Sequence, residues 1–193
     1  MGKIYIVMGK SASGKDTIYK RILEHEELGL KTVIGYTTRP IRTGETEGVE
    51  YHFVSQERFE ELKREGCVIE ARIYHTVLGE WSYFTVADGQ IDLDNQDYLM
   101  LNTLEGYQET CRYYGEDKVV PIYIEVEDGI RLFRALERER QQKEPKYAEL
   151  CRRYLADEED FSQEKLQKAG IKKKYQNFNL EECLSQIITD IQK

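Results

Sequence analysis

The sequence predicts a three-layer α/β fold on a parallel five-stranded sheet, interrupted by a small α+β insertion and by a charged helical segment. Three observations carry this prediction. Apolar runs alternate with helical patterns along most of the chain, a glycine-bounded loop joins the first run to the first helix, and two segments break the alternation. Such alternation is typical of a sheet with helices on both faces.

Five apolar runs predict strands that are buried on both faces: Lys3–Met8, Thr32–Thr38, Tyr98–Asn102, Val119–Val126 and Lys174–Phe178. Four helical patterns lie between or after them: Asp16–Glu27, Leu104–Tyr114, Asp128–Gln142 and Leu180–Ile191. Parallel strands need long crossover connections, usually helices, so this order predicts a parallel sheet.

Two segments depart from the alternation. In residues 39–87 we expect a short strand, a helix Gln56–Glu65 capped by Ser55, and strands Cys67–Tyr74 and Trp81–Val86 around a turn at residues 78–80. Residues 141–169 are highly charged and helical. We therefore expect one domain of 193 residues, with a core of residues 1–38, 88–140 and 170–193 and two insertions.

The loop after the first strand has the pattern of a phosphate-binding loop. It contains, in order, Gly9, Lys10, Ser11, Ala12, Ser13, Gly14, Lys15 and Asp16, and Thr17 follows in the helix. In this arrangement backbone N–H groups and the helix N-terminus attract phosphate oxygens, and the lysine reaches the β- and γ-phosphates. Asp16 stands where the motif usually has a hydroxyl that meets Mg²⁺. The loop predicts a nucleoside triphosphate site; the alternative is a turn that binds nothing.

Composition excludes several classes of protein. The net charge is −8, which argues against general affinity for nucleic acid. The four cysteines are scattered without a C-x-x-C pair, and no run of 18 apolar residues occurs. The first strand starts too early to leave room for a signal peptide. We expect a cytoplasmic protein with no membrane, nucleic-acid or obligate protein partner.

A second anion site is predicted in the loop after the second strand. Arg39 and Arg42 lie three residues apart there, held by Pro40, and Tyr51 adds a hydroxyl. Because the loops after parallel strands open onto one crevice, these arginines should face the phosphate loop. Paired arginines suit bidentate capture of a phosphate. The alternative is two solvated arginines on a polar loop.

This second loop resembles the signature of the guanylate kinase family: Thr37-Thr38-Arg39-Pro40-x-Arg42-x-Gly44-Glu45-x-x-Gly48-x-x-Tyr51-x-Phe53-Val54. The resemblance extends over essentially the whole chain. It implies a P-loop kinase fold with a GMP-binding insertion (39–87) and a mobile lid (about 141–169). It also implies transfer of the γ-phosphoryl group of ATP to GMP, assisted by Mg²⁺ near Asp16.

The resemblance also assigns residues to substrates. ATP is assigned to residues 9–17 and to Asn177, and GMP to six side chains: Arg39, Arg42, Tyr51, Glu70, Tyr83 and Thr85. At Glu70, a carboxylate can accept from both N1–H and the N2 amino group of guanine and would repel the N1 acceptor of adenine.

Catalytic charge neutralisation is assigned to Lys15, Arg39 and two lid arginines. Arg138 and Arg153 are the closest matches for the lid arginines. We interpret Arg131 and Arg134 as solvated residues on an ion-paired helix.

Three positions depart from the family pattern. Gly35 stands where the family has a serine that helps read the base, Phe84 replaces a glycine, and Thr103 or Asn102 occupies an aspartate position. These changes keep open the alternative of a related kinase with another acceptor, such as ribose 1,5-bisphosphate or another nucleoside monophosphate. A catalytically silent binding module is a third alternative.

Overall fold

The computed structural model describes residues 1–76 and 79–193, so part of the turn expected at residues 78–80 lies outside the described residues. Nine strands are seen in this part of the chain: β1 (Ile4–Met8), β2 (Lys31–Thr32), β3 (Tyr36–Thr37), β4 (His52–Phe53), β5 (Val68–Thr76), β6 (Gly79–Val86), β7 (Tyr98–Leu101), β8 (Val119–Glu125) and β9 (Lys174–Gln176). The α-helices in the same residues are α1 (Lys15–Leu23), α2 (Gln56–Arg64), α3 (Leu104–Tyr114), α4 (Asp128–Arg140), α5 (Tyr147–Asp160), α6 (Gln163–Lys168) and α7 (Leu180–Ile191).

The core sheet has five parallel strands in the order β2-β7-β1-β8-β9, which confirms the predicted fold class. Alternate residues of β1 point to opposite faces. Ile6 packs in the layer of α3 and α6, with Tyr107, whereas Val7 packs in the layer of α1 and α7, with Ile18 and Leu184. Both faces are therefore covered, and the first strand, which leads into the phosphate loop, is fully buried.

The strand expected at Thr32–Thr38 is divided between two sheets. β2 pairs with β7 in the core sheet, whereas β3 pairs with β4 and β6 in a second, four-stranded sheet. Between them, the side chain of Gln90 accepts from the N–H of Ile34 and donates to its carbonyl, at 2.9 and 3.2 Å. This amide replaces the ladder where the chain changes sheets. The second sheet thus begins at Tyr36, before the expected boundary at 39, and β2 is exposed rather than buried.

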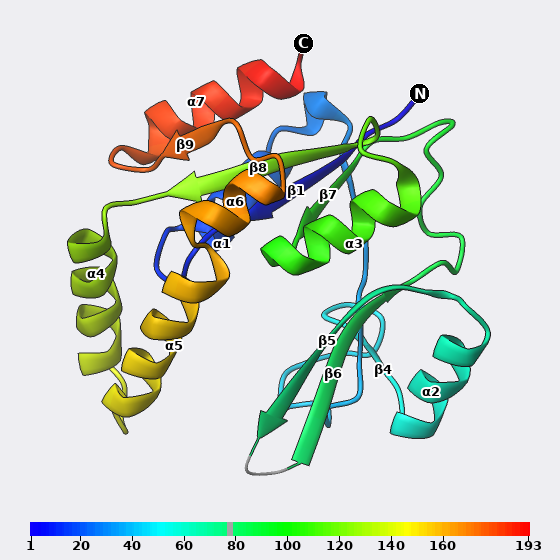
Figure 1. Cartoon of the computed structure of the whole chain (residues 1–193), viewed down its shortest axis with the longest axis horizontal. Helices are drawn as coiled ribbons and strands as arrows, with labels where there is room; N and C mark the ends of the chain where they lie inside the picture. Colours follow the sequence, from blue (N-terminus) through cyan, green and yellow to red (C-terminus); the bar gives the residue numbers. More distant parts are fainter. Residues whose placement is uncertain (77–78) are drawn as a thin grey trace.

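The second sheet has the order β4-β3-β6-β5 and packs against α2. Ser55 caps α2 as expected, accepting from the N–H of Arg58. Phe59 and Leu62 of α2 are buried against Phe84, which explains why a large side chain stands at the glycine position of the family pattern. Figure 1 shows this unit below α3 and apart from α4 and α5.

Helices α4 and α5 follow β8 and project from the core sheet at the edge where its strands end (Figure 1). They pack on each other, and α6 returns to the core through Leu166. Among the described residues, no helix is long and apolar enough to cross a membrane.

Candidate active site

The phosphate loop is fixed by close backbone contacts. A Cβ on Gly9 would lie 2.6 Å from the carbonyl oxygen of Ile124. Gly14 has φ +87° and ends the loop at the N-cap of α1, where a Cβ would lie 2.4 Å from the amide nitrogen of Asn177. Ala12 also has positive φ. Only small residues fit here, so the loop keeps its backbone N–H groups near the N-terminus of α1.

Asn177 supports the backbone of this loop through a hydrogen bond. Its side-chain amide donates to the Ser13 carbonyl at 2.8 Å, and only 5% of the residue is exposed. The backbone N–H of Asn177 is held by the carbonyl of Glu125 at the end of β8. The described contacts therefore make Asn177 a support of the loop backbone, and its assigned contact with ATP stays a prediction.

Lys15 and Asp16 begin α1. Their side chains form an ion pair of 3.0 Å, with the Asp16 side chain 70% exposed, and both line a cleft between the loop and the second sheet. Thr17 is exposed on the same turn. A carboxylate in the first turn is stabilised by the helix dipole. Asp16 is thus available to a cation that approaches from the cleft.

Acidic residues of α4 and α5 contact the other side of the loop. Asp157 accepts from the backbone N–H of Ser11 at 2.8 Å, and the Lys10 ammonium pairs with Glu158 at 2.6 Å and with Asp128 at 3.3 Å. The Asp157 carboxylate therefore binds a backbone N–H that, in this loop motif, usually donates to a phosphate oxygen.

Arg131 is at the centre of this cluster. It is only 1% exposed, so its interpretation as a solvated residue is wrong. Its guanidinium pairs with Asp128, Asp157 and Glu158 and also donates to the Ser11 carbonyl. Burial removes water from a cation, which is tolerated because three carboxylates surround it. Arg134 is half-buried and donates to the Asn177 carbonyl.

Arg138 and Arg153 lie on facing helices, α4 and α5. Both line a cavity of about 120 Å³ that also reaches Ser11 of the phosphate loop. Arg153 is 60% exposed and pairs with Glu149 at 2.8 Å. Hydrogen bonds from two arginines lower the pKa of Glu149 to about 2, and the bond from Arg152 has a larger effect than the bond from Arg153. The structure brings the two predicted lid arginines together beside the loop.

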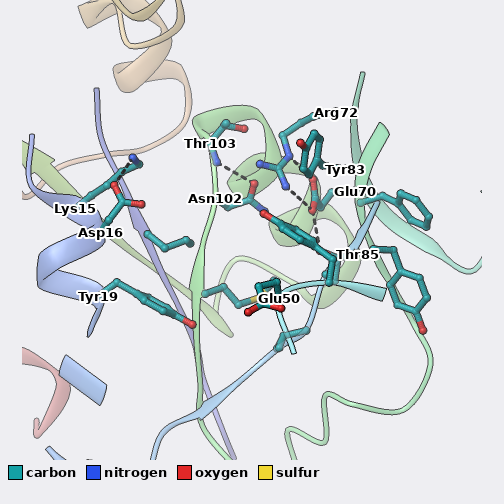
Figure 2. A pocket seen from close by; sticks show the side chains of 17 residues that line it. Lys15, Asp16, Tyr19, Glu50, Glu70, Arg72, Tyr83, Thr85, Asn102 and Thr103 are labelled. Atoms are coloured by element: carbon teal, nitrogen blue, oxygen red, sulfur yellow. Dashed lines mark hydrogen bonds and ion pairs between the residues drawn. The ribbon is translucent and has the colours of Figure 1, made fainter. Parts of the chain in front are cut away.

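The pocket between the phosphate loop and the second sheet, the proposed acceptor pocket, has a volume of about 300 Å³. Figure 2 shows Lys15 and Asp16 on one side of it and Glu70, Arg72 and Thr85 on the other. Tyr51 and Tyr83 also line it, with their rings packed edge to face. Most of the residues assigned to GMP are therefore gathered at one cavity.

Arg39 is held inside the loop that also contains Arg42 and Glu45, rather than in that cavity. It is 4% exposed, and its fork binds both oxygens of Glu45 at 2.7 Å while its Nε donates to the Tyr83 hydroxyl at 3.1 Å. Hydrogen bonds from Arg39 and from the N–H of Arg42 lower the pKa of Glu45 to about 2. The Arg42 side chain itself is exposed. Arg39 thus reaches the pocket wall through Tyr83.

Thr103 and Asn102, the two candidates for the family's aspartate position, have local structural roles. Thr103 caps α3, accepting from the N–H of Gly106, and Asn102 accepts from the N–H of Thr103 at 2.8 Å. Asn102 lies against Gly106, where a Cβ would come within 2.1 Å of its oxygen. Both line the pocket. At Gly35, a Cβ would meet only ordinary contacts, at 3.6 Å or more.

Sequence reasoning missed the ionic partners in the site: Arg72 of Glu70, and the acidic residues of α4 and α5 that contact the loop. Arg72 lies two positions after Glu70 on one strand. Because alternate residues of a strand share a face, the sequence alone could have predicted that the two side chains are neighbours. Asp157 and Glu158 had none, since they meet Ser11 and Lys10 across about 150 residues of chain.

Sequence comparison with known proteins finds a family model and several relatives that match the first half of the chain. The guanylate kinase family model matches residues 1–87. Guanylate kinase of Neisseria meningitidis serogroup A is 42% identical over 88 residues, which cover 46% of this chain and 40% of the relative. That of Aliivibrio fischeri is 40% identical over 81 residues, covering 42% and 38%. The matches thus span about two fifths of the length of these curated relatives.

Comparison of structures extends further along the chain. The crystal structure of guanylate kinase from Anaplasma phagocytophilum superposes with a TM-score of 0.67 at 19% identity, covering 99% of this chain and 85% of that one. At this identity the likeness shows the fold. Residues 1–87 are therefore similar in sequence to the guanylate kinase family, and the described chain as a whole has the fold of a guanylate kinase.

Proposed function

We propose that this protein transfers the γ-phosphoryl group of ATP to GMP. One observation carries the proposal: Lys15 of the phosphate loop and Glu70 of the second sheet line the same cavity. Phosphoryl transfer depends on positioning and on charge neutralisation more than on covalent chemistry, so a donor site and an acceptor site must open onto one space. This pocket meets that requirement.

The proposed donor site is formed by the phosphate loop and the lid. Lys15 and the loop N–H groups hold the phosphates of ATP, and Arg138 and Arg153 approach the transferring group from helices α4 and α5. The Ser11 N–H now binds Asp157 at 2.8 Å, so α5 must shift before the loop takes a phosphate oxygen. The lid, residues 141–169, is the part of the chain that we propose moves.

The proposed acceptor site is formed by the insertion, residues 39–87. Glu70 accepts from the donor edge of guanine, and Tyr51, Tyr83 and Arg42 bind the phosphate. Arg39 retains only one N–H of five without a described partner, so it acts mainly by fixing the Tyr83 hydroxyl. The Thr85 hydroxyl already donates to Glu70 and orients its carboxylate at 2.7 Å.

A magnesium ion fits the donor site. The Asp16 carboxylate is exposed at the cleft, and Mg²⁺ favours one or two carboxylates together with phosphate oxygens and water. No group of three or more potential protein ligands is found among the described residues, so the phosphates of ATP would supply most of the ligands. The ion would neutralise phosphate charge there.

The experiment is a coupled assay of ADP formation with GMP, dGMP, AMP, UMP and ribose 1,5-bisphosphate as acceptors. We expect GMP to be the best acceptor. Glu70→Gln should lower kcat/KM for GMP by about tenfold to a hundredfold, because a charge-assisted contact becomes a mismatched amide. Glu60→Gln on the exposed face of α2 is the matched control. Preferred turnover of another acceptor would contradict the proposal.

A further inference from the structure

The acceptor pocket contains an ion pair that the proposed roles do not use. Arg72 and Glu70 lie on the same face of β5, and the Arg72 Nε and Nη2 atoms are 3.2 and 3.5 Å from the two carboxylate oxygens of Glu70. The Glu70 side chain is 1% exposed and that of Arg72 is 22% exposed. The carboxylate is therefore enclosed, while the guanidinium reaches the open part of the pocket (Figure 2).

Of the two side chains that donate hydrogen bonds to Glu70, Arg72 keeps donors for a ligand and Thr85 does not. The hydroxyl of Thr85 donates its only proton to Glu70 at 2.7 Å and has none left for a base. A guanidinium has five N–H donors, of which two point to Glu70, so three remain. The contacts to Glu70 are also longer than the 2.7–2.9 Å usual for charge-assisted bonds, so the guanidinium can shift at little cost.

Guanine presents three groups in a row along one edge: the N2 amino donor, the N1–H donor and the O6 acceptor. A carboxylate complements the two donors, and a neighbouring guanidinium complements the acceptor. Adenine reverses this pattern, because it has an acceptor at N1 and an amino donor at position 6. The Glu70–Arg72 pair is also neutral as a whole, which suits an uncharged base in an enclosed pocket.

We propose that Arg72 is a specificity-determining residue of the acceptor site, donating to the O6 carbonyl of guanine while Glu70 accepts from N1–H and the N2 amino group. The inference rests on the proposed function. In this proposal two residues on one face of β5 recognise the base: Glu70 binds its two donor groups and Arg72 binds its acceptor. Thr85 holds Glu70 in place.

The test compares GMP with its 6-thio analogue, which keeps both donors of the base but carries a weaker acceptor at position 6. Kinetics are measured for the wild type, Arg72→Met, Arg72→Lys and the control Arg64→Met, a residue on exposed α2. We expect the wild type to prefer GMP by at least about tenfold, as expected for one hydrogen bond to a charged group. Arg72→Met should remove that preference, mainly through a higher KM for GMP, and Arg64→Met should keep it.

A loss of turnover that is equal for the two acceptors in Arg72→Met would overturn the inference, since it indicates only a structural role. Faster use of GMP by this variant would also overturn it, because Arg72 would then compete with guanine for Glu70. Arg72→Lys keeps the charge beside the enclosed carboxylate, and its GMP preference decides the matter if Arg72→Met does not fold. A wild type that prefers GMP only weakly refutes the role of Arg72 alone, whereas one without GMP turnover refutes the proposed function as well.

Discussion

The proposed acceptor side and the proposed donor side of the cleft neutralise their buried charges in opposite ways. On the acceptor side each partner is a near neighbour in sequence: Arg39 pairs with Glu45, and Glu70 pairs with Arg72. On the donor side the partners come from distant helices, and contacts of Asp157 and Glu158 with the loop span 146 and 148 residues.

This difference distinguishes ion pairs that persist when helices move from ion pairs that break. A pair within one loop or strand persists when whole elements move, because both members move together. A pair between α5 and the phosphate loop breaks as soon as α5 shifts, and each of its members must then find water or a ligand. Under the proposed function, the acceptor side is thus preorganised, whereas the donor side would exchange protein carboxylates for phosphate.

The largest effect is expected at Lys15, the donor-side cation nearest to the acceptor pocket. Lys15→Ala should lower kcat by about a thousandfold, since a charge aimed at the transferring group is lost. Its melting temperature should change little because the side chain lies in the cleft. Coupled assays and thermal unfolding check both expectations, with the exposed Lys20→Ala as control. Activity within tenfold of the wild type would contradict the donor assignment.

Glu45 tests whether the local acceptor-side pairs stabilise the fold. Its pKa is lowered to about 2, so the carboxylate stabilises the protein above its ordinary pKa near 4.5, and this contribution is lost as pH falls through 2. Glu45→Gln should therefore melt below the wild type at pH 7, and the two curves should converge between pH 4.5 and 2. A pH-independent difference would show that charge is not the cause.

Asp157 tests the proposed donor side. Asp157→Asn removes the negative charge that competes with phosphate at the Ser11 N–H, so affinity for a non-hydrolysable ATP analogue should rise about tenfold at low salt. The gain should shrink at high salt, which screens the repulsion. Calorimetry checks this, with Glu159→Gln, an exposed charge two residues further along α5, as the control. Equal gains in both variants would indicate a general charge effect.

Gly35 is expected to give the smallest effect. The pocket has room for a Cβ at this position, so Gly35→Ser should fold normally and raise kcat/KM for GMP by about threefold to tenfold through one added hydroxyl contact. Gly35→Ala adds the Cβ alone and is the matched control. If both variants lose activity together, steric contact with the substrate outweighs any recognition by the serine.

Elements that rest on local pattern were predictable from the sequence. Four of the five core strands, together with α3 and α7, were expected within one or two residues of their observed bounds, because apolar periodicity and caps such as Thr103 fix them. The division of the strand at Thr32–Thr38 was not, since the Gln90 side chain that bridges the gap lies 56 residues away.

The candidate site was predictable where backbone geometry or a family motif determines it, as at the phosphate loop. It was not predictable where side chains satisfy one another. The sequence around Arg131, a helix of mixed charge, predicts an exposed side chain. Arg131 is buried because α5 packs beside it and supplies Asp157 and Glu158 as partners. Long-range ion pairs leave no periodic trace in sequence.

The hydrogen bond from the Asn177 amide to the phosphate loop bears on the order in which parts of the protein fold. It holds the Ser13 carbonyl across 164 residues, and the strand β8 beside the loop is also distant in sequence. Contacts of such separation form late, because closing a long loop costs chain entropy before the contact repays it. During synthesis, residues 1–87, which match the family model, leave the ribosome before the residues that support the phosphate loop. Nucleotide binding should therefore report that the C-terminal strand has docked, and a truncation before residue 177 should lose it.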